Sequence, residues 1–222
     1  MARRRERRAS VRGTAPAPVA RVRMTGEERR QQLLDVARSL FAEKGFDGAS
    51  VEEIANRANV SKPVVYEHFG GKEGVYAVVV DREMHYLLGS MSSALAEDAH
   101  PRLLLERAAI ALLDYVQGSA DGFRILVRAS PVASATGTFS SLLNDIASQV
   151  ENILGVQFSS RGYDQKLAAL YSQALVGMVA LTGQWWLDAR KPKRDEVAAQ
   201  LVNLCWNGLS HLESKPELRE SH

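Results

Sequence analysis

Apolar residues recur at helical spacing along most of this chain, and no stretch alternates apolar with polar positions as a strand does. The first helical stretch, residues 27–44, carries four apolar residues on one face: Leu33, Ala37, Leu40 and Phe41. Gly45 is suited to end this helix, because glycine adopts the left-handed backbone of a C-cap at little steric cost. The pattern predicts an all-α protein.

Two short helices joined by a tight turn follow. Ser50 and Glu53 have the spacing of a capping box at the start of the first short helix. Asn59 interrupts the apolar pattern and tolerates left-handed turn geometry. Ser61 is expected to cap the second helix, and Pro63 lies in its first turn, where the missing N–H costs little. The stretch is a helix-turn-helix, which indicates a DNA partner.

Six further helices bring the expected total to about nine. They are predicted at residues 72–96, 101–117, 121–128, 138–154, 164–189 and 194–212. Breaks are expected at residues 131–137 and 155–162. A helix of ~25 residues spans ~37 Å, so the first of the six is long enough to start in a DNA-binding domain and end in a second domain.

These elements divide the chain into four parts. We expect a disordered arm at residues 1–24, a DNA-binding domain of three helices at 25–74, a larger helical domain at 75–213, and a frayed tail at 214–222.

The composition is that of a soluble globular protein, with 45% hydrophobic and 24% charged residues among 222. No apolar run approaches ~18 residues, so no membrane span is expected. The N-terminus lacks the apolar core of a signal peptide, and the single cysteine, Cys205, excludes an internal disulfide; both indicate the cytoplasm. The five histidines show no metal-ligand spacing, and no Gly-rich phosphate loop is present, so we expect neither an enzyme nor a cofactor.

Charge is distributed unevenly. Residues 1–24 hold eight arginines and one glutamate, a balance of +7, and the rest of the chain balances to −5. Residues 25–74 carry seven basic and nine acidic residues. The arm either contacts DNA, along phosphates or in a minor groove, or is a solubilising tail or a leader before a true start at Met24. The acidic balance of the DNA-binding domain favours a DNA contact by the arm. Without the arm, the release of counterions from DNA would depend on few side chains.

Residues 33–76 resemble the tetracycline-repressor (TetR) family of transcriptional regulators. The matching elements are Leu40-Phe41, Gly45-Phe46, Ser50 to Ala55, Val60-Ser61, Tyr66, His68-Phe69 and Lys72-Glu73. The resemblance implies a homodimer that binds a palindromic double-stranded DNA operator and usually represses. It also implies that residues 75–213 bind a small-molecule effector and dimerise. The effector would move the helix after the helix-turn-helix, so that the two recognition helices no longer fit half-sites about 34–36 Å apart or somewhat more.

The resemblance also implies DNA contacts. Residues expected to touch phosphates are Ser50, Ser61, Tyr66, His68 and Lys72. The alternative is that the serines only cap helices and that the tyrosine packs within the domain. Lys62, Pro63 and Val64 begin the recognition helix, where side chains reach base edges. The family commonly has Gly-Thr or Gly-Ser in place of Pro63-Val64, so a more apolar surface, suited to thymine methyl groups, is expected here.

The second domain supplies less specific signals. Candidate residues for an effector pocket are Met84, Leu88, Tyr115, Phe123, Arg124 and Trp185. The alternative is that these aromatic and apolar residues form the core. Candidate dimer-interface residues on the last two helices are Tyr171, Ala174, Met178, Leu181, Leu201, Leu204 and Cys205. Two such helices from each subunit would form a four-helix bundle, unless the same faces form the core of a monomer.

A second function class stays open. The chain could be a helical ligand-binding or protein-interaction module whose helix-turn-helix no longer recognises DNA. The acidic charge of residues 25–74 and the presence of Glu67 on the recognition helix support this alternative, although Glu67 is expected to point away from DNA.

Overall fold

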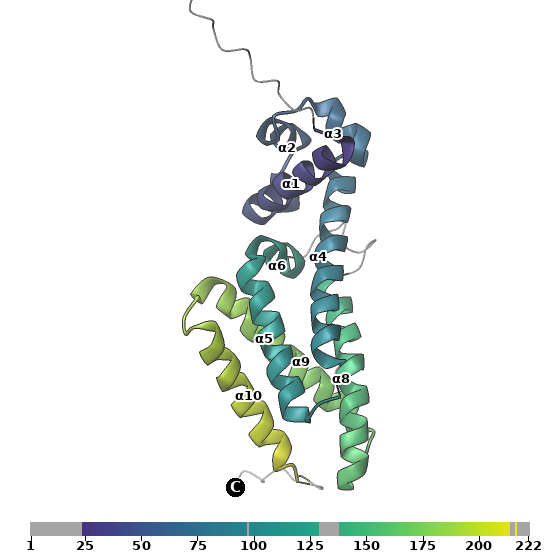
Figure 1. The fold of residues 1–222 in the computed structure, drawn as a ribbon, viewed down its shortest axis with the longest axis vertical. Helices are drawn as coiled ribbons and strands as arrows, with labels where there is room; N and C mark the ends of the chain where they lie inside the picture. Colours follow the sequence, from purple (N-terminus) through teal and green to yellow (C-terminus); the bar gives the residue numbers. More distant parts are fainter. Residues whose placement is uncertain (1–23, 97, 129–137, 214–215, 217–222) are drawn as a thin grey trace, which may run out of the picture.

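The computed structural model describes residues 24–96, 98–128, 138–213 and 216. The described part consists of nine α-helices and contains no strand, which confirms the predicted all-α fold (Figure 1). The helices are α1 (Gly26–Gly48), α2 (Val51–Arg57), α3 (Lys62–Phe69), α4 (Lys72–Leu95), α5 (Pro101–Gly118), α6 (Ala120–Val127), α8 (Phe139–Arg161), α9 (Leu167–Ala189) and α10 (Arg194–Ser210). The predicted arm, the predicted loop at 131–137 and most of the predicted tail lie outside the described residues.

Helices α1, α2 and α3 form a small module at one end of the molecule (Figure 1). α1 begins with a capping box that the sequence analysis missed: Thr25 Oγ1 accepts from the Glu28 backbone N–H, and the Glu28 carboxylate accepts from the Thr25 N–H at 2.7 Å. The predicted apolar face of α1 is confirmed, since Leu33, Ala37, Leu40 and Phe41 are at most 1% exposed. Ile54 of α2 and Val65 of α3, both fully buried, complete the core of this module.

The helix-turn-helix has the predicted turn but not both predicted caps. The Ser50 hydroxyl accepts from the Glu53 N–H at 3.2 Å, whereas the Glu53 carboxylate bonds to Lys44 and not to the Ser50 backbone. Asn59 adopts a φ of 53°, as expected for the turn. The expectation that Ser61 caps α3 was wrong: Ser61 occupies the N-cap position, but its side chain accepts no hydrogen bond from the described backbone of α3.

The end of α3 and the start of α4 are in very close contact. A Cβ atom on Gly74, in the first turn of α4, would lie 1.8 Å from the carbonyl oxygen of Phe69, the last residue of α3. Only glycine fits this position without moving one helix away from the other. The recognition helix and α4 are therefore connected rigidly.

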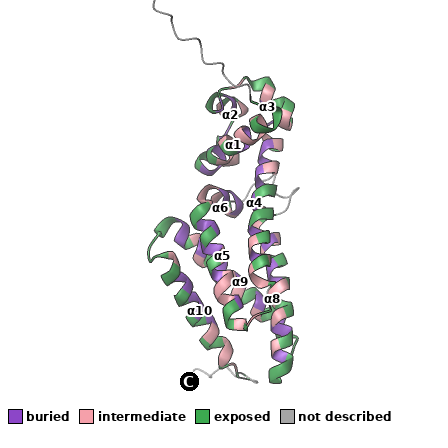
Figure 2. Ribbon diagram, in the orientation of Figure 1, coloured by how far each residue is buried: buried purple, intermediate pink, exposed green. Residues whose placement is uncertain are grey.

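Helix α4 links the module to the larger bundle, as predicted from its length. It contacts α1 in the module and α5, α6 and α8 in the bundle. Figure 1 shows α4 running from the module into the bundle, where it lies beside α8. The other main contacts are α8 on α9, α5 on α10 and α1 on α6. Figure 2 shows buried positions on the facing sides of these helices, and one apolar core runs through the module and most of the bundle.

The predicted break at residues 155–162 was wrong, because α8 continues to Arg161 and ends at Gly162, where φ is 76°. Phe158 accounts for the continuation, because it is buried with ring centroids 5.6 Å from Tyr163 and 5.4 Å from Tyr171. Gly155 lies inside the helix, where an added Cβ would lie 3.1 Å from the side-chain nitrogen of Gln165.

Among the described residues, one helix is long and apolar enough to cross a membrane. It is α9, whose most apolar window of 18 residues has a mean hydropathy of 1.2 and is 33% buried. Core helices of soluble proteins also have this composition, and α9 packs along α8 and α5.

Candidate nucleic-acid interface and effector cavity

The predicted base-contacting side chains lie on the exposed start of α3. Lys62 and Pro63 are exposed, and Val64 is half-buried. Tyr66, one turn further on, is 54% exposed and lies beside Gly71. Glu67 is also exposed. Val65 points into the module core and Val64 packs against it, whereas Lys62, Pro63 and Tyr66 are presented outward.

The predicted phosphate contacts fall into two groups. Ser50 and Ser61 are exposed at the starts of α2 and α3, where backbone N–H groups favour anions. Lys72 is half-buried instead: its Nζ donates to the Phe46 carbonyl at 3.1 Å and lies 4.2 Å from the centre of the Phe46 ring. His68 is also half-buried, next to Phe69. The Ser50 hydroxyl is bonded to Glu53, the Ser61 hydroxyl makes no capping bond, and Lys72 is held against the end of α1.

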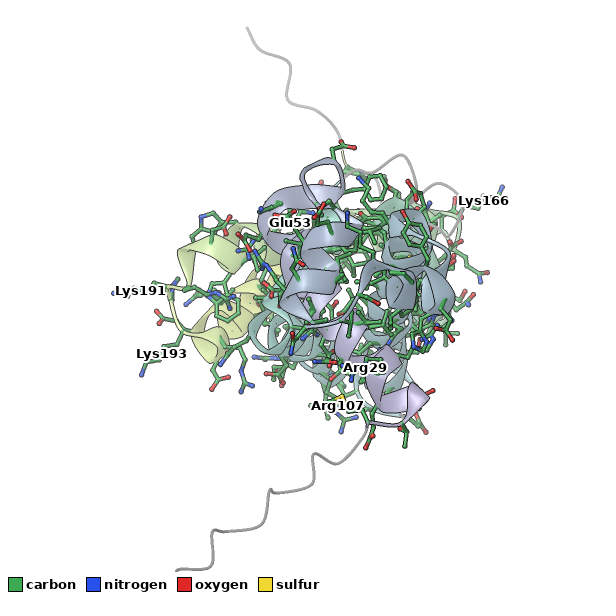
Figure 3. The ribbon with its side chains drawn as sticks, turned by 90° about the horizontal axis from the view of Figure 1, so that it is seen from above. Arg29, Glu53, Arg107, Lys166, Lys191 and Lys193 are labelled. Atoms are coloured by element: carbon green, nitrogen blue, oxygen red, sulfur yellow. The ribbon has the colours of Figure 1, made fainter. Side chains whose placement is uncertain are left out.

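The positive charges of the module are committed within the protein. Residues 25–74 are all described, and each of their seven lysines and arginines has a partner. The ion pairs are Arg38–Glu83, Lys44–Glu53, Arg57–Glu43 and Lys62–Glu52. Arg29 donates to Gln32, Arg30 stacks over Phe69, and Lys72 bonds to Phe46. Figure 3 shows the module end-on and labels Glu53 of α2 and Arg29 of α1. An exposed ion pair stabilises a protein by only ~0–1 kcal/mol, so DNA phosphates can displace the carboxylates. Until that happens the paired charges largely cancel, and the module attracts DNA weakly from a distance.

A partly open cavity of about 100 Å³ lies in the bundle between α4, α5, α8, α9 and α10. Every side chain that lines it is apolar. Leu87 of α4, Leu112 of α5 and Phe139 of α8 are among them, and Trp206 contributes from α10. The cavity suits a hydrocarbon group and offers no partner for a polar one.

None of the six predicted pocket residues lines this cavity. Met84 and Leu88 pack against the main core, and Phe123 is fully buried in it. The Tyr115 hydroxyl binds Glu83, and Arg124 pairs with Asp188 at 3.2 Å. Trp185 is 56% exposed, whereas its neighbour Trp186 is buried and donates to the Pro192 carbonyl. The lining residues carry the same periodic signal as core residues, and no sequence feature separates the two.

A buried polar cluster that the sequence did not indicate lies between the module and the bundle. The Glu83 carboxylate of α4 accepts from the Tyr115 hydroxyl at 2.7 Å, from Ser119 Oγ at 3.1 Å and from Arg38 Nη1 at 3.4 Å. Burial, reinforced by the adjacent Glu83 charge, raises the pKa of Tyr115 far above its usual range. The phenol therefore stays protonated and acts as the donor to Glu83.

The outer face of α9 is an exposed apolar stripe. Leu170, Leu181 and Trp185 are 64%, 65% and 56% exposed, and the small residues Ala174 and Gly177 lie between them.

The predicted dimer-interface residues are divided by the structure. Ala174 and Leu181 belong to the α9 stripe, and Leu204 is 63% exposed on α10. Tyr171 and Met178 are half-buried against neighbours in the same chain. Leu201 and Cys205 are 6% and 4% exposed, because α10 turns this face toward its own subunit.

Comparisons with known proteins agree with this architecture. Residues 33–79 match the model of the bacterial regulatory proteins of the tetR family, and residues 101–208 match that of the tetracyclin repressor-like C-terminal domain. The HTH-type transcriptional activator FasR of Mycolicibacterium smegmatis is 30% identical over 200 residues, which cover 86% of this chain and 87% of FasR.

Solved structures show the same fold. A TetR-like transcriptional regulator from Rhodococcus sp. RHA1 superposes with a TM-score of 0.70 at 26% identity, over 85% of this chain and 99% of that one. The transcriptional regulator FadR of Bacillus subtilis was solved in complex with stearoyl-CoA. It superposes with a TM-score of 0.64 at 19% identity, over 80% of this chain and 98% of FadR. These relatives are DNA-binding regulators and not enzymes. The chain belongs to the TetR family of transcriptional regulators.

Proposed function

We propose that this protein is a homodimeric regulator that binds a palindromic operator through α2 and α3 and is released when an apolar ligand enters the bundle cavity. The observation that carries the proposal is the position of α4. This helix begins in tight contact with the recognition helix at Gly74 and lines the cavity with Leu87 and Met91 further along. A ligand that displaces α4 therefore also displaces the recognition helix.

The size of the cavity supports a ligand-dependent change of shape. Pockets for small ligands usually measure ~300–1,000 Å³, and this one measures about 100 Å³. A ligand with a long chain fits only if α4, α5 and α8 move apart. Such a ligand binds the widened state better than the closed state, and this difference in affinity is what shifts the equilibrium.

The chemistry of the lining supports a ligand with a long alkyl chain. Each buried methylene contributes ~0.8 kcal/mol, whereas an unpaired polar group in an apolar site costs ~1–3 kcal/mol. The FadR structure was solved with stearoyl-CoA, which combines such a chain with a large polar head. We propose a long-chain acyl ligand whose chain lies in the cavity and whose polar head stays outside it.

The dimer is proposed to form through the stripe of Leu170, Ala174, Leu181 and Trp185 on α9. Val156 is 67% exposed on α8, the helix that packs against α9. Helices α8 and α9 of two subunits would then form the four-helix bundle, in place of the expected α9 and α10.

The DNA contacts are proposed to be those implied by the family resemblance: phosphates for Ser50, Ser61, Tyr66, His68 and Lys72, and base edges for Lys62, Pro63 and Val64. Lys62 reaches a base only after leaving Glu52. Whether the operator lies over or beside a promoter, and not the fold, decides between repression and activation. Acting on DNA in this way, the protein is proposed to work in the cytoplasm.

The experiment is fluorescence anisotropy with DNA from upstream of the protein's own coding sequence, at low salt, with and without stearoyl-CoA. We expect binding to the DNA and release by stearoyl-CoA, with coenzyme A alone as the control. The internally paired cations favour the second candidate, an interaction module that does not recognise DNA. Equal binding to upstream and unrelated DNA, or no binding at low salt, would support that second candidate and overturn the proposal.

A further inference from the structure

Glu83 is the one charged side chain that the described part of the chain buries, with 8% exposure. Its three partners come from three different helices or their ends: Arg38 from α1, Tyr115 from α5, and Ser119 between α5 and α6. A buried carboxylate is stable only while such donors satisfy it. The cluster therefore fixes a single relative position of these helices.

The cluster adjoins the upper end of the cavity. Glu83 precedes Leu87 by one turn of α4, and Tyr115 follows Leu112 by one turn of α5; both leucines line the cavity. An aromatic series makes a second connection: Tyr115 packs edge-on against Phe123 at 6.1 Å, and Phe123 against the cavity-lining Phe139 at 5.7 Å. Widening the cavity between α4 and α5 necessarily changes the distance from Glu83 to Tyr115.

On its other side the cluster holds the DNA-binding module. Arg38 lies on α1, one turn before Phe41 of the module core. The carboxylate is packed closely on one side, since a Cβ on Gly122 would lie 2.0 Å from Glu83 Oε2, and on another side it borders a polar pocket of about 950 Å³ that Arg38 and Tyr115 also line. If Tyr115 moves away, the carboxylate loses its shortest hydrogen bond and must rearrange with Arg38. The hydrogen bonds of Glu83 to Tyr115 and to Arg38 therefore depend on each other.

We propose that Glu83 is the positioning residue that couples occupancy of the cavity to the orientation of the DNA-binding module. This inference rests on the proposed function, in which the cavity takes a ligand. Glu83 touches neither DNA nor ligand; it acts through Arg38 on one side and Tyr115 on the other. The nearby Arg82–Gln31 contact at 2.9 Å is exposed and supplies no comparable constraint.

The test measures the factor by which stearoyl-CoA changes operator affinity, in the unmodified protein and in two variants. Coupling factors between allosteric sites are typically ~5–150-fold. In Glu83→Gln and in Tyr115→Phe we expect the factor to fall below about threefold, with stearoyl-CoA binding retained. Asp188→Asn, which removes the exposed Arg124–Asp188 pair, is the matched control and should leave the factor unchanged. Tyr115→Phe keeps the ring and the packing, so it remains informative if Glu83→Gln does not fold.

A second measurement separates this inference from the choice of ligand. Ala108→Leu adds three carbons at a lining position and partly fills the cavity. We expect it to weaken operator binding in the unmodified background and to have little effect in the Glu83→Gln background, a non-additivity that marks coupling. If stearoyl-CoA has no effect but this non-additivity is found, the acyl ligand is wrong and the coupling stands. Additive effects, or a Glu83→Gln protein that responds to stearoyl-CoA like the unmodified one, would overturn the role of Glu83.

Discussion

Replacing Gly74 with alanine tests the tight connection between the recognition helix and α4. In an ordinary helical position this change stabilises a protein by ~0.5–1 kcal/mol, because glycine loses more backbone freedom on folding. Here the new Cβ would lie 1.8 Å from the Phe69 carbonyl oxygen, far inside van der Waals contact. Carbonyl and helix are both backbone and cannot rotate away, so the two helices must separate.

The magnitude follows from these two opposing terms. Forcing extra atoms into a packed site costs ~1–3 kcal/mol, so the net effect of Gly74→Ala is a loss of up to ~2 kcal/mol after the helical gain. For a chain of this size, 1 kcal/mol shifts Tm by ~2–4 °C. We therefore expect a fall in Tm of a few degrees, together with weaker operator binding, since α3 is displaced.

Gly89→Ala is the matched control, because Gly89 lies exposed in the same helix and a Cβ there meets nothing within 4 Å. This control should raise the stability measured by urea unfolding by ~0.5–1 kcal/mol and leave DNA binding unchanged. The reasoning is refuted if Gly74→Ala is as stable as Gly89→Ala and binds the operator equally well.

Three further predictions concern the arm, the dimer and the cysteine. Deleting residues 2–23 should weaken operator binding and flatten its dependence on salt, because the module's own cations are paired. This prediction would be contradicted if the full-length and the shortened protein had the same operator affinity at every salt concentration. Leu181→Glu should give a monomer in analytical ultracentrifugation, whereas Leu204→Glu should not; the reverse result would assign the interface to α10. Burial raises the pKa of the Cys205 thiol, so its reaction with a disulfide reagent at pH 7 should be slow in the folded protein and fast in urea, and rapid labelling of the native protein would be inconsistent with the packing of α10.

Most of the fold was predictable because its signals are local. Apolar spacing located the helices, and Asn59 marked the turn after α2, whereas Gly45, expected to end the first helix, forms a kink inside α1, which continues to Gly48. The main error, the expected break after residue 154, arose because the continuation of α8 depends on the contact of Phe158 with Tyr171 of α9. That contact forms after the chain has turned back, and no local pattern contains it.

The candidate sites also differ in whether a local sequence pattern or the packing of distant helices creates them. The exposed candidate DNA contacts on α3 follow from the helix-turn-helix alone, since the face opposite Val65 must point outward. The cavity and the Glu83 cluster depend on distances between helices. Trp185 and Trp186 illustrate the limit: they are adjacent, yet one is 56% exposed and the other 3%. Glu83 has charged neighbours in sequence, but its partners lie 32 to 45 residues away.

The internal pairing of the module's cations affects how the protein searches a genome. Affinity for random DNA comes almost entirely from phosphate contacts, and four of the module's seven lysines and arginines already face carboxylates. A regulator must find its operator among ~10⁶–10⁹ competing sites. Weak retention of the module at those sites would leave a larger share of the molecules free to occupy the correct one.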